Sequence, residues 1–276
     1  MNISHPRGRR DYNVPRNRYH HWLYVWVPLA TAFVWFGTVL ALLITWLASG
    51  RPHYVSMSDD QTIAYISDVA ADFLKPLFIT GCAITAIGFV FCLAVERWAR
   101  HEGRLLPDMR RREKVMGSLA IFWSFVGGVG LILLSIFDTK RHSRLHRVFL
   151  LIFVVGTALS AIFTVIEFRW LDKTFGRRFR LLRIAYLIKA IFVFILIVLA
   201  IAFGALLDSS SPNDGAIIEW TIAFLFTVYL LTFWFDLRQS KGVEKGDLSP
   251  ERLVGNVNGT YGNMHAALEC TGIFEI

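Results

Sequence analysis

Six long apolar stretches constrain the fold of this chain more than any other feature of its sequence. They cover residues 22–48, 73–95, 116–137, 148–168, 184–207 and 218–235. Each is close to the length of about 20 residues that an α-helix needs to cross the hydrocarbon core of a bilayer. Because a backbone amide inside lipid has no water to bond, each stretch must satisfy its own hydrogen bonds as a helix. We therefore predict an all-α, polytopic membrane protein with a six-helix bundle.

Arginine and lysine gather in alternate gaps between these stretches. The N-terminal tail, the second gap, the fourth gap and the C-terminal tail together hold 22 of the 29 basic residues. Short loops rich in Lys and Arg stay in the cytoplasm, so we expect both termini to be cytoplasmic. An even number of spans also requires the tails to share one side. The predicted organisation is a basic tail (1–21), one membrane domain (22–236) and a mobile C-terminal tail (237–276) that lacks hydrophobic periodicity.

The net charge of +8 points to a membrane surface rather than to nucleic acid. The basic clusters flank the spans, where anionic lipids of the inner leaflet attract Lys and Arg. A simpler alternative is that these charges only fix the topology. We select the following arginines as candidates for binding inner-leaflet lipid or a protein partner: Arg110, Arg111, Arg112, Arg177, Arg178 and Arg180.

Two ionisable residues lie within or at the edge of the predicted spans. Lys189 is about six residues from the inner end of the fifth stretch, and Glu167 is near the inner end of the fourth. Antiparallel neighbouring helices would allow the two to pair, which would offset much of the cost of removing them from water. Lys189 also has a stem long enough to reach the interface. A role in transport or gating is the third alternative.

Four further ionisable residues lie near the outer membrane boundary, each at a different helix entrance: Asp68, Asp138, His146 and Glu219. A bundle that brought them together would form a polar cap over an apolar groove. Such buried groups need hydrogen-bond partners. They would hold the outer loops in place, bind a lipid headgroup, or carry out acid–base chemistry on a lipid ester.

His142 and His146 are four residues apart, which places them on one face of a continuous helix. With Asp138 this spacing suggests a metal site. However, a third ligand is not defined, and the turn must reverse the chain, so we expect interfacial hydrogen bonding and no metal. Common soluble catalytic motifs are missing from the sequence, including a phosphate-binding glycine loop and a Gly-x-Ser-x-Gly elbow. We expect no cofactor and favour a non-enzymatic protein.

Small residues recur at helical spacing inside three of the spans and predict close helix contacts. They are Gly81 and Gly88 in the second span, Gly127, Gly128 and Gly130 in the third, and Gly156 and Ser160 in the fourth.

Three short segments together resemble the Frag/DRAM/Sfk family of six-span membrane proteins. The first runs from Tyr65 to Asp68 and continues into a span through Pro76. The second is the Ser-Ile-Phe-Asp sequence that ends at Asp138, followed by His146 and Phe149. The third pairs Glu219-Trp220 at the start of the last span with Phe235-Asp236 at its end. The resemblance covers residues 22–236.

The resemblance implies one of three roles, and the segments are most similar to the fungal suppressor-of-four-kinase branch. That branch implies a plasma-membrane protein that organises lipids and supports a phosphatidylinositol 4-kinase. The other branches imply remodelling of the lipid of GPI anchors in Golgi or ER membranes, or modulation of autophagy at the lysosome or vacuole. The partners implied are membrane lipids, including anionic inner-leaflet lipid, and a phosphatidylinositol 4-kinase complex. Nucleic acid is not implied as a partner.

Overall fold

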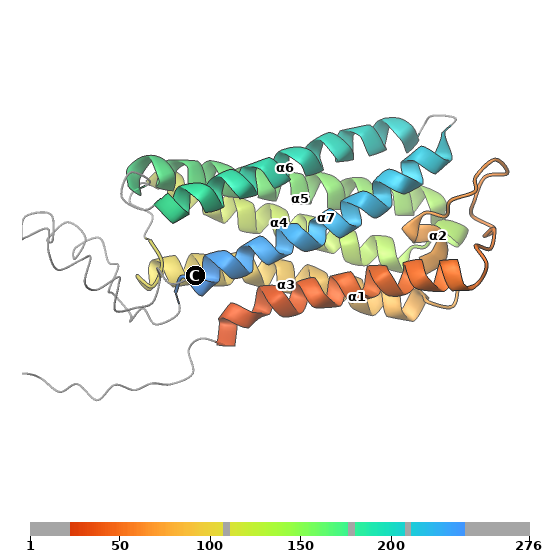
Figure 1. Cartoon of the computed structure of the whole chain (residues 1–276), viewed down its shortest axis with the longest axis horizontal. Coiled ribbons are helices and arrows are strands. Elements are labelled where there is room, and N and C mark those ends of the chain that lie inside the picture. Colours follow the sequence, from red (N-terminus) through yellow and green to blue (C-terminus); the bar gives the residue numbers. More distant parts are fainter. Residues whose placement is uncertain (1–22, 107–110, 176–179, 208–210, 241–276) are drawn as a thin grey trace, which may run out of the picture.

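A computed structural model describes residues 23–106, 111–175, 180–207 and 211–240, and this part of the chain is all-helical (Figure 1). Its elements, in chain order, are η1 (Leu23–Trp26), α1 (Val27–Ala48), α2 (Ile66–Ala70), α3 (Lys75–His101), α4 (Arg111–Ile136), α5 (Thr139–Phe175), α6 (Arg180–Leu207) and α7 (Pro212–Arg238). The short helix α2 lies in the loop between α1 and α3. The other six α-helices form one elongated bundle.

All six helices are long and apolar enough to cross a membrane, which confirms the predicted spans. Their large exposed side chains, such as Phe33, Ile87, Phe194 and Ile201, are apolar and suit contact with lipid tails. The principal difference from the sequence prediction is length. The predicted second span ends at residue 95, whereas α3 continues to His101, so the helix carries charged residues that the prediction had placed in a loop.

The helices alternate in direction, so both ends of the described chain lie at the same end of the bundle (Figure 1). Tyr24 Oη and Ser240 Oγ are 2.8 Å apart and join η1 to the residues that follow α7. We call this the tail end of the bundle. We call the opposite end, which carries the loop of residues 49–74 and the α4–α5 turn, the loop end. Residues 1–22 and 241–276 lie outside the described residues. The second range contains most of the C-terminal tail that was predicted to be mobile.

Close packing of helices depends on the small residues that the sequence singled out. A Cβ added to Gly156 of α5 would be 2.6 Å from the backbone nitrogen of Gly127 in α4, so the two backbones touch. The Ser160 hydroxyl donates to the carbonyl of Ala120 across the same interface, at 2.8 Å. On the other side of the bundle, Gly81 of α3 packs directly against Thr38 of α1. These contacts confirm the prediction of close helix approach at small residues.

An aromatic cluster fills the centre of the bundle. The ring of Phe89 in α3 meets the rings of Phe226, Tyr229 and Phe233 in α7, with centroids 5.7 to 6.2 Å apart and edge-to-face geometry. Trp35 of α1 joins the cluster through Phe226, and its indole N–H donates to the carbonyl of Ala223 at 2.8 Å. Edge-to-face aromatic pairs stabilise the packing by more than the burial of their surface area alone. The cluster fixes α7 between α1 and α3.

Candidate functional site: a capped cavity and a buried ion network

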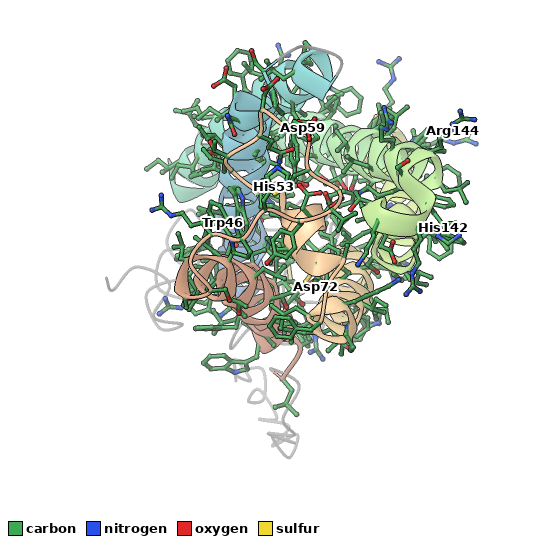
Figure 2. The ribbon with its side chains drawn as sticks, turned by 90° about the vertical axis from the view of Figure 1, so that its right-hand side faces the viewer. Trp46, His53, Asp59, Asp72, His142 and Arg144 are labelled. Atoms are coloured by element: carbon green, nitrogen blue, oxygen red, sulfur yellow. The ribbon has the colours of Figure 1, made fainter. Side chains whose placement is uncertain are left out.

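The loop of residues 49–74 covers the loop end of the bundle and is anchored to α7. The amide Oδ1 of Asn213 accepts hydrogen bonds from the backbone N–H of Thr62 and of Ile63, at 2.8 and 2.9 Å. Two turns further along α7, the indole of Trp220 donates to the carbonyl of Ala64 at 2.9 Å. Figure 2 looks onto this end and shows the loop, with His53 and Asp59, crossing over the helices. The loop is a cap held by specific bonds.

Asp68 organises this cap from within. Its carboxylate accepts hydrogen bonds from the Ser56 hydroxyl at 2.6 Å, the Gln61 amide at 3.2 Å and the backbone N–H of Tyr65 at 3.0 Å. The bond from Tyr65 caps the N-terminus of α2, because the Asp68 carboxylate accepts a hydrogen bond from a backbone N–H that has no partner within the helix. Asp68 is only 3% exposed. The carboxylate therefore has three donors and stabilises the folded loop.

Asp138 performs a similar role at the turn between α4 and α5. It accepts hydrogen bonds from Lys75 Nζ at the start of α3 and from the backbone N–H of Arg141 at 2.7 Å. Burial alone would raise the pKa of Asp138, but the bonds from Lys75 and Arg141 outweigh it and hold the pKa below its usual value. Asp138 is thus an ionised link between α3 and α5.

His146 is buried and bonds to the end of the preceding helix. Its Nδ1 lies 2.9 Å from the carbonyl oxygen of Leu134 and 3.0 Å from that of Phe137. Because both partners are acceptors, Nδ1 carries the proton. His142 does not share this face, contrary to the expectation of one continuous helix. The backbone of α5 leaves helical geometry at His142, with φ −136° and ψ 49°, and the residue points outward (Figure 2).

Glu219 is placed differently from the other three residues. Its Oε2 accepts a hydrogen bond from the backbone N–H of Ile66 at 2.7 Å, and its side chain lines an apolar cavity. Burial raises the pKa of the neighbouring Tyr65, and the nearby carboxyl groups of Glu219 and Asp68 raise it further. Within the described residues, hydrogen bonds do not join any two of Asp68, Asp138, His146 and Glu219. The four residues share the loop end but do not form a catalytic relay.

The cavity beneath the cap has a volume of about 120 Å³. Its wall is almost entirely apolar and comes from every helix of the bundle, with α5, α6 and α7 contributing most of it. Representative lining residues are Trp35, Phe78, Phe153, Ala200, Phe203 and Phe226. Glu219 is the carboxyl group of this wall, which also includes the hydroxyl-bearing Thr157 and Tyr229. A mostly apolar cavity with a few polar groups has the general character of a small-molecule or lipid site.

A second polar feature, the buried ion network, lies in the tail-end half of the bundle. Lys189 of α6 is 1% exposed and forms an ion pair with Asp236 of α7. Its ammonium group also lies over the rings of Phe168 and Phe233, at 4.4 and 4.1 Å from their centroids. The predicted pairing of Lys189 with Glu167 is therefore wrong. The reason is that α7 presents Asp236 directly to Lys189.

Glu167 of α5 pairs instead with two arginines of α3. Its Oε1 lies 3.8 Å from Arg97 Nη1 and 3.6 Å from Arg100 Nε. Arg100 also bonds Glu96 one turn earlier at 2.6 Å, and its guanidinium lies 4.9 Å from the ring centroid of Phe168. The network thus joins α3, α5, α6 and α7. The sequence analysis did not identify Glu96 or Arg100 as buried partners, and it used Asp236 only for the family resemblance. The Glu–Arg spacing of four residues on a helix was the available signal for Glu96 and Arg100.

The structure describes only part of the predicted basic surface. Arg111 and Arg112 are exposed at the first turn of α4, at the tail end. Arg110, Arg177 and Arg178 and the side chain of Arg180 lie outside the described residues. Lys114, Arg169 and Arg238 are additional exposed basic residues at this end. A separate group, Arg144 with Lys140, Arg141 and Arg147, is exposed at the loop end, where Arg144 projects from the edge of the bundle (Figure 2).

Metal binding finds no support in the described residues, where no three His, Cys, Asp or Glu side chains are grouped to hold an ion. The fold and its polar features define the class: a polytopic, all-helical membrane protein with a capped apolar cavity and a buried ion network. The sequence matches the family described as "Frag1/DRAM/Sfk1/Cwh43P N-terminal domain" over residues 23–240. The chain belongs to this family, in agreement with the resemblance found in its sequence.

Two fungal relatives are similar over most of this chain. "Protein sfk1" of Schizosaccharomyces pombe is 30% identical over 223 residues, which is 80% of this chain and 66% of the relative, just under two thirds. "Protein SFK1" of Saccharomyces cerevisiae is 25% identical over 274 residues, covering 76% of each chain. No solved structure matches the chain.

Proposed function

We propose that this protein is a non-enzymatic membrane protein that organises membrane lipids and supports recruitment of a phosphatidylinositol 4-kinase at the plasma membrane. The tail end of the bundle faces the cytoplasm in this proposal. Membership of the family and similarity to the two fungal relatives support it. The kinase and the plasma membrane come from what the resemblance to the fungal branch implies.

The observation that carries the proposal is the set of exposed basic residues at the tail end. Arg111, Arg112 and Lys114 project from the first turn of α4, and Arg169 and Arg238 lie at the same end of α5 and α7. Each Lys or Arg near an anionic leaflet contributes about 1 kcal/mol of attraction. A surface of this kind suits both anionic inner-leaflet lipid and an acidic protein partner. Arg110, Arg177, Arg178 and Arg180 are further members of this surface in the proposal.

Replacing Arg111 and Arg112 by Gln tests the proposal, since both are exposed and their loss does not disturb the core. Losing roughly 2 kcal/mol of attraction lowers local binding by up to about 30-fold. We expect less tagged kinase at the plasma membrane in cells, and less phosphatidylserine around the protein when it is extracted with its surrounding lipid.

The matched control is Arg144→Gln with Arg147→Gln, which removes two exposed arginines from the loop end. We expect this control to leave kinase recruitment and surrounding phosphatidylserine unchanged. Equal effects of the two double variants would contradict the proposed orientation. Unchanged recruitment in the Arg111/Arg112 variant, followed by unchanged recruitment when Arg110, Arg177, Arg178 and Arg180 are also neutralised, would contradict the kinase role.

A further inference from the structure

We propose that the capped cavity binds one acyl chain of a lipid from the loop-end leaflet, and that a primary ammonium group in the headgroup of that lipid donates to Glu219. This inference rests on the proposed lipid-organising function and gives it a ligand class and a site. The cavity is distinct from the basic surface at the tail end, so the two are testable separately.

The length of the cavity wall matches the depth of one leaflet of a bilayer. Along α7 its wall runs from Glu219 to Tyr229, and along α5 it runs from Leu150 to Ala161. At 1.5 Å of rise per residue, each of these segments spans about 15 Å. Half of a hydrocarbon core that is about 30 Å thick is also about 15 Å. The lining residues therefore extend over the depth of one leaflet, and their apolar side chains suit contact with one extended acyl chain.

The carboxyl group of Glu219, at the loop-end edge of the cavity, selects the headgroup. Glu219 accepts one hydrogen bond, from the backbone of Ile66, although a carboxylate has room for about four donors. In the described part of the chain, neither Glu219 nor Asp68 forms an ion pair with a lysine or arginine. The nearby Lys75 is engaged by Asp138. A carboxylate in apolar surroundings is costly without a donor, and a primary ammonium supplies both hydrogen bonds and the opposite charge.

Helix α6 gives the cavity a side that borders the lipid. Only 17% of its most apolar segment is buried, compared with 44% for α7. Its tail-end half is fixed by the ion pair of Lys189 with Asp236, while its loop-end half lies over the cavity through Ala200 and Phe203. Phe203 in turn contacts Tyr65 of the cap, with ring centroids 6.4 Å apart. Among the helices that line the cavity, α6 thus has the smallest buried share, and its exposed side chains suit contact with the bilayer.

The test uses the full chain in nanodiscs that contain phosphatidylethanolamine or phosphatidylcholine, each carrying the same photoreactive acyl chain. After irradiation, labelled peptides are identified by mass spectrometry. In the unaltered protein we expect phosphatidylethanolamine to label the cavity walls of α5, α6 and α7 at least fivefold more than phosphatidylcholine. The quaternary ammonium of phosphatidylcholine has no N–H to donate, so the comparison isolates the contact with Glu219.

Two variants separate the acyl chain from the headgroup. Ala200→Phe fills the cavity from α6 and should reduce wall labelling by both lipids at least fivefold. Glu219→Gln should reduce labelling by phosphatidylethanolamine to the level of phosphatidylcholine. The matched controls are Ala205→Phe on the exposed face of α6 and Asp214→Asn on the exposed first turn of α7. We expect both controls to label as the unaltered protein does.

Each outcome decides. Unchanged wall labelling in Ala200→Phe would overturn the acyl-chain site, and equal labelling by the two lipids, or no effect of Glu219→Gln, would overturn the headgroup contact. Kinase recruitment, measured with the Arg111/Arg112 variant, is an independent readout. If the unaltered protein does not prefer phosphatidylethanolamine but the Arg111/Arg112 variant recruits less kinase, this inference alone is overturned. If the preference is present but recruitment is unchanged in the Arg111/Arg112 variant and in its extension to the other four arginines, the kinase role alone is overturned.

Discussion

Replacing Lys189 by Met is the substitution with the largest effect that we expect on stability. Lys189 is 1% exposed, pairs with Asp236 and lies over two aromatic rings. Methionine has a similar length and fits the same apolar space, so loss of packing is small. What remains is the carboxylate of Asp236, which is 5% exposed and has lost its lysine partner in the tail-end half of the bundle.

The size of the effect follows from the asymmetry between breaking and replacing a buried ion pair. Removing one partner of such a pair costs about 3–5 kcal/mol, because it leaves an uncompensated buried charge. Replacing both partners by apolar residues is often close to neutral. We therefore expect Lys189→Met to lower the free energy of unfolding by about 3–5 kcal/mol. We expect Lys189→Met combined with Asp236→Leu to recover most of that loss.

Unfolding in mixed micelles with increasing denaturing detergent, followed by tryptophan fluorescence, measures these differences. Lys140→Met, which alters an exposed lysine at the loop end, is the control and should change the free energy by less than about 0.5 kcal/mol. A Lys189→Met variant as stable as the unaltered protein would refute the reasoning. So would a double variant that loses the sum of the two single effects, because coupled partners must be non-additive.

Two smaller predictions concern helix packing and pH. Gly156→Val should lower the free energy of unfolding by about 1–3 kcal/mol or more, because a Cβ there would be 2.6 Å from the backbone of Gly127; Gly204→Val, where a Cβ meets nothing within 4 Å, is the control in the same assay. The depressed pKa of Asp138 means that its bonds stabilise the fold above about pH 4 and are lost as the pH falls through the lower folded-state pKa. In a pH titration of the free energy of unfolding, Asp138→Asn should abolish the loss of stability at acid pH. The control Asp59→Asn, at an exposed position, should retain that loss.

The spans and the main helix contacts were predictable because their signals are local. A helix that crosses lipid must be long and apolar, and this property is readable from the sequence without knowledge of its neighbours. Close approach of backbones requires small residues, so Gly127 and Gly156 indicated the α4–α5 interface directly. The orientation of the termini relative to the cytoplasm stays a prediction from the basic residues.

The partner of Lys189 was not predictable in the same way, because it depends on how helices far apart in sequence face each other. Glu167 was the obvious candidate while α3 was assumed to end at residue 95. Since α3 continues to His101, it presents Arg97 and Arg100 to Glu167, and Asp236 is left for Lys189. The kink at His142 was equally hidden, since the spacing of the two histidines suggested an unbroken helix.

The two polar features of the bundle differ in a way that bears on function. In the ion network, Lys189, Arg100 and Glu167 each have a partner of opposite charge. Moving an ion through that network would require breaking buried pairs at several kcal/mol each, which argues for a structural role that fixes α6 and α7. Glu219 faces an apolar space with a single donor. A donor group of a ligand therefore meets less competition at Glu219 than at the paired carboxylates of the network, in line with the acyl-chain site proposed above.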